Sequence, residues 1–435
     1  MAVHRAQHLV RRGAATYLRT LREATPNAKH YLAAVTLQGV AIGLVGTLFA
    51  IYLKTAGFSE ALVGDVEGAL AAAAAVTCLL IPPLVAVVGY RTLLIVAALA
   101  FAASRFGQIL PVSAAVLVAL GLLYGIGDGI MRSVGVPFLS EHIGGRDRTL
   151  LFTVDFFLRV GSSVVGSLLG GLLPTLLVFL GVAELASYRG SLALGAGIFA
   201  FAAIPALQVH ERVQHVGHPW AGYMRSVRGF RSWNRLVRFA VPDGVLSLGA
   251  GLIMPFIALY LKEHVGASVA EIGFIQGAMS VAMAAAILGA PLVARRFGPI
   301  GTVVLTEVLS LPFLVAIPLA TSVAGVATLM WIRAMLMNMS WPLFNEATMD
   351  RMPAHDKPLI SGWMSVAWSA CWVIGSVAGG RIMEYSYTLP YFLAAAFYAG
   401  GALLTWLLLG GGRYLGPTDG HDARTGADPV LDSSA

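Results

Sequence analysis

Twelve long apolar stretches run through this sequence of 435 residues and restrict what it can fold into. Each stretch is close to the ~20 residues that an α-helix needs to cross the hydrocarbon core of a bilayer. Only 12% of the residues are charged, whereas soluble proteins carry roughly 25%. The sequence therefore predicts an all-α membrane protein with twelve transmembrane helices. We expect them at about 31–54, 61–82, 92–110, 113–139, 150–175, 189–208, 239–262, 270–293, 300–320, 323–346, 358–383 and 388–410.

The basic residues predict how these helices are oriented. Of the 29 Lys and Arg residues, 21 fall at the chain ends and in the connections on one side, and four fall in connections on the other. Cytoplasmic loops carry such an excess. We therefore expect both termini in the cytoplasm and the protein in a bacterial inner (plasma) membrane. The same asymmetry accounts for the net charge of +7, so we expect no nucleic acid as a partner.

The second half of the chain repeats the first. LFAIYLKTAGFSEALVGDVEGALAAAAA at 48–75 aligns with FIALYLKEHVGASVAEIGFIQGAMSVAM at 256–283, and Gly89 aligns with Gly298 at a spacing of 209 residues. Further glycines repeat in the same way: Gly64, Gly166, Gly170 and Gly171 correspond to Gly273, Gly375, Gly379 and Gly380. The repeat predicts two pseudo-symmetric six-helix bundles, and duplicated transporters of this kind bind substrate near the midplane where the halves meet.

The repeat divides the chain into five expected segments. The two bundles occupy 31–208 and 239–411. The cytoplasmic linker 209–238 alternates Arg with apolar residues, a basic amphipathic pattern suited to anionic lipid headgroups. Residues 1–30 form a basic cytoplasmic segment, and residues 412–435 form a polar cytoplasmic tail that we expect to be disordered.

Over about residues 31–411 the chain resembles the major facilitator superfamily. Besides the duplicated bundles, the resemblance rests on the connection between the second and third helices, where the family pattern is G-x-x-x-D-R-x-G-R-R. The first half keeps Gly89 and Arg91 without the Asp, and the second half keeps Arg295, Arg296 and Gly298. The resemblance implies alternating access with these residues in gating loops. It also implies a cavity lined by the first, fourth, seventh and tenth helices, as in bacterial exporters of drugs and other organic compounds.

Two Asp/Arg pairs lie inside neighbouring predicted helices. Asp128 and Arg132, like Asp155 and Arg159, are four residues apart, a spacing that places each pair on one helix face. Intramembrane charges usually face a bundle interior or an aqueous cavity, and two such pairs at similar depth could join in a four-charge network. We favour a structural role over a coupling role for Asp155 and Arg159.

Asp128 is the predicted proton-coupling site, tuned by Arg132 and Arg333. The repeat places Arg333 of the tenth helix opposite Asp128 at an offset of 205 residues. A structural ion pair that holds one closed state is the alternative. Other charges carry weaker expectations: Glu67 is expected to be solvated near the outer surface, Asp243 to be interfacial, and Glu307 and Arg105 to be snorkelling or paired.

The tenth and eleventh helices carry bulky, adaptable apolar side chains. Such a lining suits an amphipathic or apolar ligand, although these side chains could instead pack the bundle or meet lipid. The predicted cavity residues are Gln38, Trp331, Met335, Asn338 and Trp368.

No enzyme motif is present in the sequence: it lacks a phosphate-binding loop, an HExxH motif and Cys/His zinc spacing. We therefore expect no catalytic activity, no cofactor and no metal. The expected function is proton-coupled export of amphipathic or hydrophobic organic molecules by a monomer embedded in the lipid bilayer. The alternatives are an uptake symporter or uniporter for a small polar nutrient, a lipid or glycolipid flippase, and a membrane sensor or scaffold without transport.

Overall fold

Helices account for all the regular structure in the described residues of the computed structural model, which are 24–142, 148–211, 219–353 and 356–410. Eleven of the described helices are long and apolar enough to cross a membrane. One of them, α3 (Glu60–Gln108), has 49 residues, and the non-helical backbone of Gly89 divides it into two helical segments. Its length of roughly 74 Å exceeds twice the ~30 Å core of a bilayer, so α3 crosses twice. The described residues thus make the twelve expected crossings.

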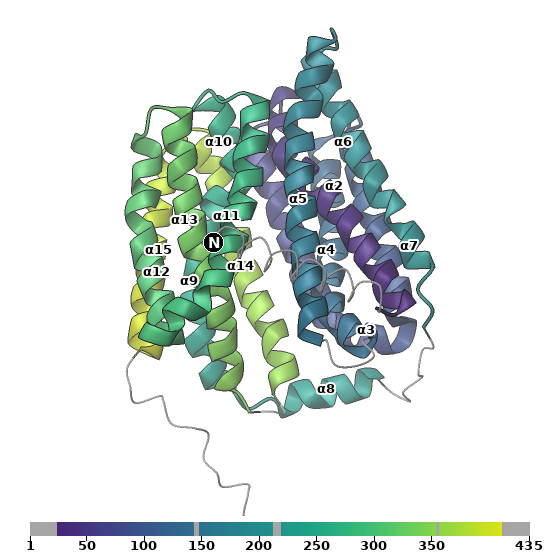
Figure 1. Cartoon of the computed structure of the whole chain (residues 1–435), viewed down its shortest axis with the longest axis vertical. Helices are drawn as coiled ribbons and strands as arrows, with labels where there is room; N and C mark the ends of the chain where they lie inside the picture. Colours follow the sequence, from purple (N-terminus) through teal and green to yellow (C-terminus); the bar gives the residue numbers. More distant parts are fainter. Residues whose placement is uncertain (1–23, 143–147, 212–218, 354–355, 411–435) are drawn as a thin grey trace, which may run out of the picture.

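The helices form two bundles side by side (Figure 1). The N-terminal bundle contains α2 (Pro26–Thr55), α3, α4 (Ala114–His142), α5 (Arg148–Phe179), α6 (Glu184–Phe201) and α7 (Ala203–Leu207). The C-terminal bundle contains α9 (Trp233–Ile253), α10 (Ile257–Glu263), α11 (Val269–Phe297), α12 (Pro299–Ala316), α13 (Val323–Asp350), α14 (Lys357–Met383) and α15 (Leu389–Leu409). The short helix α8 (Pro219–Gly229) lies at the lower end of Figure 1. We call this end the linker face and the opposite end the far face.

Capping residues explain where several helices begin. Thr25 caps α2 through its side chain, and Pro26 occupies the first turn, a position where Pro costs no hydrogen bond. The helix therefore starts five residues before the expected residue 31. Ser268 and Glu271 form a reciprocal capping box at the start of α11. The helix α9 begins at Trp233, inside the range expected for the linker.

The two glycine turns on the linker face have the same backbone conformation. Gly89 has φ 76° and ψ 166°, and Gly298 has φ 71° and ψ 166°. Residues other than glycine rarely adopt such positive φ angles. The agreement confirms that the two positions, 209 residues apart, are structurally equivalent.

Equivalent glycines also pack the two bundles in the same way. A Cβ on Gly166 of α5 would collide with the carbonyl oxygen of Val40 on α2, and one on Gly375 of α14 would collide with that of Leu248 on α9. Small residues of this kind let membrane helices approach closely. The internal repeat is therefore a repeat of helix packing as well as of sequence.

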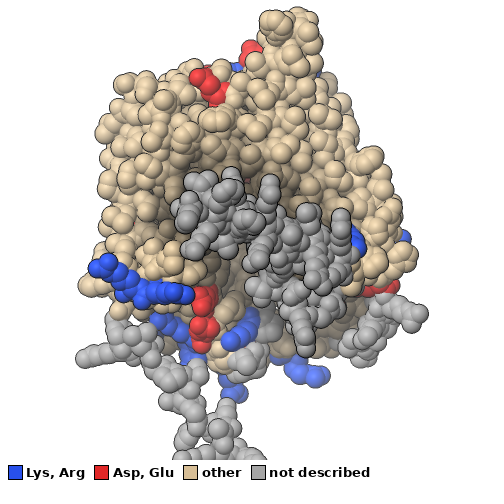
Figure 2. Space-filling view, in the orientation of Figure 1, with Lys and Arg blue, Asp and Glu red and all other residues tan. Residues whose placement is uncertain are grey.

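Basic residues gather on the linker face. Figure 2 shows Lys and Arg along this end of the visible surface, whereas the far face shows mainly Asp and Glu. On α8, Arg225 and Arg228 are exposed while Tyr223 and Val227 pack partly against the C-terminal bundle, as an amphipathic surface helix requires. The predicted N-terminal segment up to residue 23 and the predicted tail from residue 412 lie outside the described residues.

Orientation can be tested with introduced cysteines in a background without Cys78 and Cys371. Ser59 and His264 are exposed on the far face, and Arg231 is exposed on the linker face. Ala267, a further far-face position, is unsuitable because it is only 4% exposed. We expect Ser59→Cys and His264→Cys to react with an impermeant thiol reagent in intact cells, and Arg231→Cys to react only after lysis. The reverse labelling pattern would show that the far face, and not the linker face, is cytoplasmic.

Candidate transport site

A cleft of about 580 Å³ opens between the two bundles on the linker face. Its walls come from α3 and α4 on one side, from α14 on the other, and from Tyr223 of α8. Most of the lining is apolar: Cys78, Leu79, Ile81, Pro82, Val85, Val136, Pro137, Leu359 and Gly362. Hydroxyl groups come from Tyr90, Ser133, Tyr223, Ser361 and Ser365. The cleft therefore offers a mixed surface with a few hydrogen-bonding groups.

Arg132 is the one charged residue among the described residues that line this cleft. Its Nε donates to Asp128 Oδ2 at 2.6 Å, as the four-residue spacing predicts. The Arg132 side chain is 62% exposed, whereas that of Asp128 is 21% exposed. The cleft therefore presents the guanidinium of Arg132, whereas the carboxylate of Asp128 that pairs with it is less accessible.

Two further charged residues, Glu67 and Arg105, interact in the N-terminal bundle near this pair. Glu67 of α3 interacts electrostatically with Asp128 and with Arg105. Arg105 is 5% exposed and donates to Gln108 Oε1 at 2.6 Å. Its guanidinium also lies about 4 Å from the ring centres of Phe49 and Tyr124. The expectation that Glu67 is simply solvated near the surface is therefore wrong.

Asp155 and Arg159 form the predicted pair on α5. Arg159 Nε donates to Asp155 Oδ2 at 2.9 Å, and Arg159 Nη2 donates to the hydroxyl of Tyr31 on α2 at 2.6 Å. The expected four-charge network does not form in the described residues. Each Asp pairs with the Arg of its own helix, and the remaining hydrogen bond of Arg159 goes to Tyr31 on α2.

Arg333 forms no ion pair with Asp128, which binds Arg132 instead. Arg333 is 5% exposed, and its guanidinium lies 5.0 Å from the ring centre of Tyr398 on α15. Its Nε and Nη2 atoms are buried and have no hydrogen-bond partner. The Arg333 side chain lies against α15 of its own bundle. Its role in tuning Asp128 stays a prediction.

The predicted cavity residues lie outside the lining of the cleft. Gln38 is 3% exposed, and its amide nitrogen has no partner. Trp331 donates to the carbonyl of Ile275 at 3.0 Å and so joins α13 to α11. The Asn338 amide donates to the carbonyl of Ala334 on its own helix, 2.9 Å away.

The remaining two predicted cavity residues differ in environment. Met335 is 38% exposed. Trp368 packs between Trp341 and Trp372 with ring centres 5.4 and 6.3 Å away. Aromatic packing thus explains the tryptophans of α13 and α14 without a ligand.

The predicted gating residues cluster at the linker-face turns. Arg91 follows the Gly89 turn, and its backbone N–H donates to Glu211 at 3.1 Å. Arg295 and Arg296 are exposed at the end of α11, next to the Gly298 turn. Both turns therefore place basic side chains at this face.

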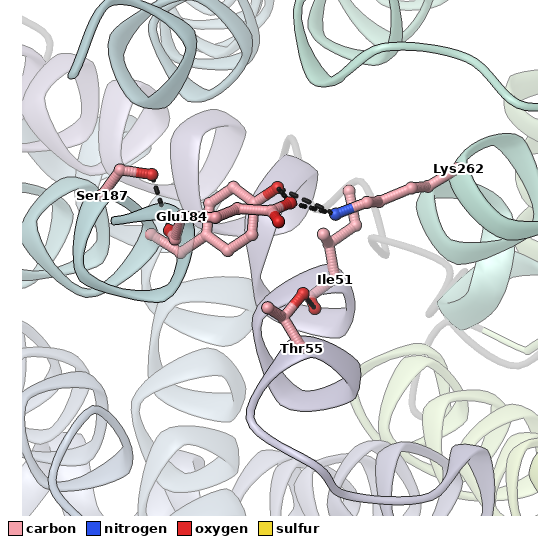
Figure 3. A network of polar contacts seen from close by, with 6 residues as sticks. Ile51, Thr55, Glu184, Ser187 and Lys262 are labelled. Carbon is pink, nitrogen blue, oxygen red and sulfur yellow. Dashed lines mark hydrogen bonds and ion pairs between the residues drawn. The ribbon is translucent and has the colours of Figure 1, made fainter. Parts of the chain in front are cut away.

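The far face is closed by polar contacts between the bundles. Lys262 of α10 reaches Glu184 of α6 at 2.7 Å and the hydroxyl of Tyr188 at 2.9 Å. Figure 3 shows this contact beside the end of α2, where Ile51 and Thr55 lie. Arg381 of α14 binds Asp65 of α3 at 2.8 Å. Exposed pairs like these contribute about 0–1 kcal/mol each, so the contacts are readily reversible.

Tyr387 adds a third contact across the far face. Its hydroxyl donates to Glu60, which also pairs with Lys54 at 2.6 Å. Burial and this hydrogen bond raise the pKa of Tyr387, so the phenol keeps the proton that it donates.

Below these polar contacts the bundles meet backbone to backbone. A Cβ on Gly273 of α11 would lie 2.5 Å from the carbonyl oxygen of Ser167 on α5. At the pseudo-symmetric position, a Cβ on Gly64 of α3 would lie 2.3 Å from the carbonyl oxygen of Ser376 on α14. The structure is therefore sealed at the far face and open at the linker face.

Comparisons with known proteins agree with this architecture. Residues 4–176 match the model of the MFS_1 like family, and residues 244–429 match that of the Major Facilitator Superfamily. No curated protein matches the sequence significantly. The chain therefore has both halves in common with the major facilitator superfamily.

Solved structures of low sequence identity share the whole fold. The nucleoside transporter NupG is 13% identical with a TM-score of 0.71, covering 88% of this chain and 99% of its own. A bacterial homolog of the human lysosomal transporter Spinster, in an inward-facing and occupied conformation, is 12% identical with a TM-score of 0.70, covering 88% and 97%. A D-xylose-proton symporter is 16% identical with a TM-score of 0.63, covering 87% and 97%. The fold of this chain is the major facilitator fold.

Proposed function

We propose that this chain is a secondary transporter that moves amphipathic or hydrophobic organic molecules by alternating access, coupled to protons at Asp128. The observation that carries the proposal is the asymmetry of the seam: a cleft on the linker face and reversible contacts on the far face. Duplicated bundles that rock about a central seam expose such a site to each side in turn.

Proton coupling follows from the pair on α4. Because Asp128 holds Arg132 by a charge-assisted hydrogen bond, protonation of Asp128 would release the guanidinium to the cleft. The charge that the cleft presents to a substrate would then depend on whether Asp128 is protonated. Loss of the proton would restore the pair, so proton binding and substrate binding would affect each other.

The lining of the cleft supports an amphipathic substrate. Leu79, Val85 and Leu359 provide apolar contact area, whereas Arg132 and Ser365 provide directed polar contacts. Ligand sites commonly combine an apolar lining with a few polar groups that fix orientation. Export of such molecules across the inner membrane of a bacterium is the direction that we propose.

Uptake is the second candidate direction. It is favoured by the hydroxyl groups in the cleft and by the likeness to a nucleoside transporter and to a D-xylose-proton symporter. In that case the substrate is a small polar nutrient, and Arg132 and the hydroxyl groups take a larger share of binding.

The proton-coupling proposal predicts a specific loss in Asp128→Asn. Substrates are first identified by thermal shift with a compound panel, and their flux is then measured in proteoliposomes. The variant should lose accumulation driven by a pH gradient by about tenfold or more, which corresponds to ~1.4 kcal/mol of coupling. Equilibrium exchange should persist because binding needs no net proton movement.

The matched control is Asp350→Asn, which removes an exposed carboxylate at the end of α13. It should leave both accumulation and exchange unchanged. Normal gradient-driven accumulation in Asp128→Asn would remove Asp128 from the mechanism.

A further inference from the structure

Two acidic side chains are buried inside the C-terminal bundle, away from the cleft. Asp243 of α9 is 6% exposed and Glu307 of α12 is 2% exposed. Asp243 is ten residues from the start of α9 and Glu307 is eight from the start of α12. At 1.5 Å per residue, both lie roughly 12–15 Å inside the linker face. They therefore share one level within the hydrocarbon core.

Neither carboxyl group has a counter-ion. Among the described residues no Lys, Arg or His forms an ion pair with Asp243 or Glu307, and Glu307 Oε2 is buried without any hydrogen-bond partner. The charged group that acts on Glu307 is Asp243 itself, so the two acids are near enough to repel each other when ionised.

The helices packed around the pair supply no neutralising charge. On α14, Cys371 interacts with Asp243, and its sulfur would lie 3.0 Å from a Cβ on the adjacent Gly244. On α15, the titratable groups are Tyr391 and Tyr398, and the guanidinium of Arg333 from α13 lies over the Tyr398 ring. On α11, the charged residues Arg295 and Arg296 are exposed at the helix end.

The internal repeat shows that the bundle can be built without these acids. The offset of 209 residues places Ala98 at the position of Glu307 (307−209). The offset of 208 between Tyr52 and Tyr260 places Val35 at the position of Asp243 (243−208). Ala98 and Val35 are buried at 0% and 1% exposure in the N-terminal bundle. Packing therefore does not require carboxyl groups at these positions.

An ionised carboxylate is very costly in such surroundings unless it is paired, and a buried group without a partner becomes neutral instead. Two carboxyl groups that share a site do not both ionise, because the like charges repel. We propose that Asp243 and Glu307 form a proton-binding pair in the C-terminal bundle, separate from Asp128, that holds at least one proton at neutral pH.

The proposal that Asp243 and Glu307 share a proton does not depend on whether Asp128 couples transport to protons. If transport is proton-coupled, the pair gives each bundle its own proton site. The helix that lies beside Asp243, α14, also carries Ser365 on the wall of the cleft. Movement of α14 during alternating access would therefore change the access of water to the pair.

The test is infrared spectroscopy of the purified full-length protein in liposomes, titrated with pH and with Na⁺. The carbonyl stretch of protonated carboxyl groups is compared in wild type, Asp243→Asn, Glu307→Gln and the double variant. Wild type should show this band at neutral pH, and the double variant should lose the part that ionises only in alkaline solution. Asp128→Asn, the matched control, should keep that part.

Two results would overturn the proposal. One is a band unchanged in the double variant, and the other is a band that saturating Na⁺ removes at neutral pH, which would mark a cation site. Should the variants fail to fold, wild type labelled with carboxyl-¹³C aspartate and, separately, with carboxyl-¹³C glutamate keeps the proposal falsifiable. At least one label must shift a protonated-carboxyl band at neutral pH, and no shift with either label would contradict a protonated pair.

Discussion

Replacing Arg159 by Leu is expected to lower the free energy of unfolding by about 2–3 kcal/mol. Breaking a fully buried ion pair costs ~3–5 kcal/mol because the remaining charge stays desolvated. Arg159 is 38% exposed, so water and salt screen part of that cost. The loss strands Asp155, whose Oδ1 already has no partner, and removes the donor to Tyr31.

The double variant Asp155→Leu/Arg159→Leu separates a structural role from a coupling role. Without a stranded charge it should regain most of the melting temperature. If the pair is structural, flux returns as well; if it serves coupling, stability returns without flux. Arg296→Leu at the exposed end of α11 is the control, with an expected change within ~0.5 kcal/mol. An Arg159→Leu protein with normal stability and flux would exclude both roles.

Replacing Gly273 by Ala is expected to open the far face. The added Cβ would lie 2.5 Å from the carbonyl oxygen of Ser167 and 2.7 Å from the Cα of Gly171. Both are backbone atoms, which cannot move aside as a flexible side chain can. Overpacking of this kind costs about 1–3 kcal/mol. Because the added methyl group destabilises only the state with a sealed far face, the ratio of open to sealed molecules should rise roughly 5- to 150-fold.

The neighbouring Gly277 supplies a matched control on the same helix. A Cβ there would lie 3.6 Å from Val164, which is ordinary contact, so Gly277→Ala should keep the wild-type equilibrium. The readout is the reactivity of Thr47→Cys, since Thr47 is fully buried at the seam and bonded to Gln276. Equal thiol reactivity in the two alanine variants would refute the proposed seal.

Apolar length and the internal repeat predicted most of this fold. The twelve crossings and the equivalence of Gly89 with Gly298 follow from features that depend on one helix or one turn at a time. The start of α2 was misplaced because the Thr25 cap and Pro26 extend the helix through polar residues. Hydropathy alone does not register such a cap.

The candidate site was less predictable because contacts depend on the direction in which each side chain points. The pair Asp128/Arg132 was found because both residues lie on one helix. The repeat matches Arg333 to Asp128 by position along the helix, and that position does not specify the direction in which the Arg333 side chain points. Asp243 and Glu307 come from helices distant in sequence, so their proximity had no local signal.

Distances between spin labels on both faces test alternating access most directly. One label pair at Ser59 and His264 reports on the far face, and a second at Arg91 and Arg296 reports on the linker face; all four positions are exposed. Relative to Gly277→Ala, the Gly273→Ala protein should show a longer far-face distance and a shorter linker-face distance. Both distances unchanged, or both moving in the same direction, would contradict a transporter that rocks about this seam.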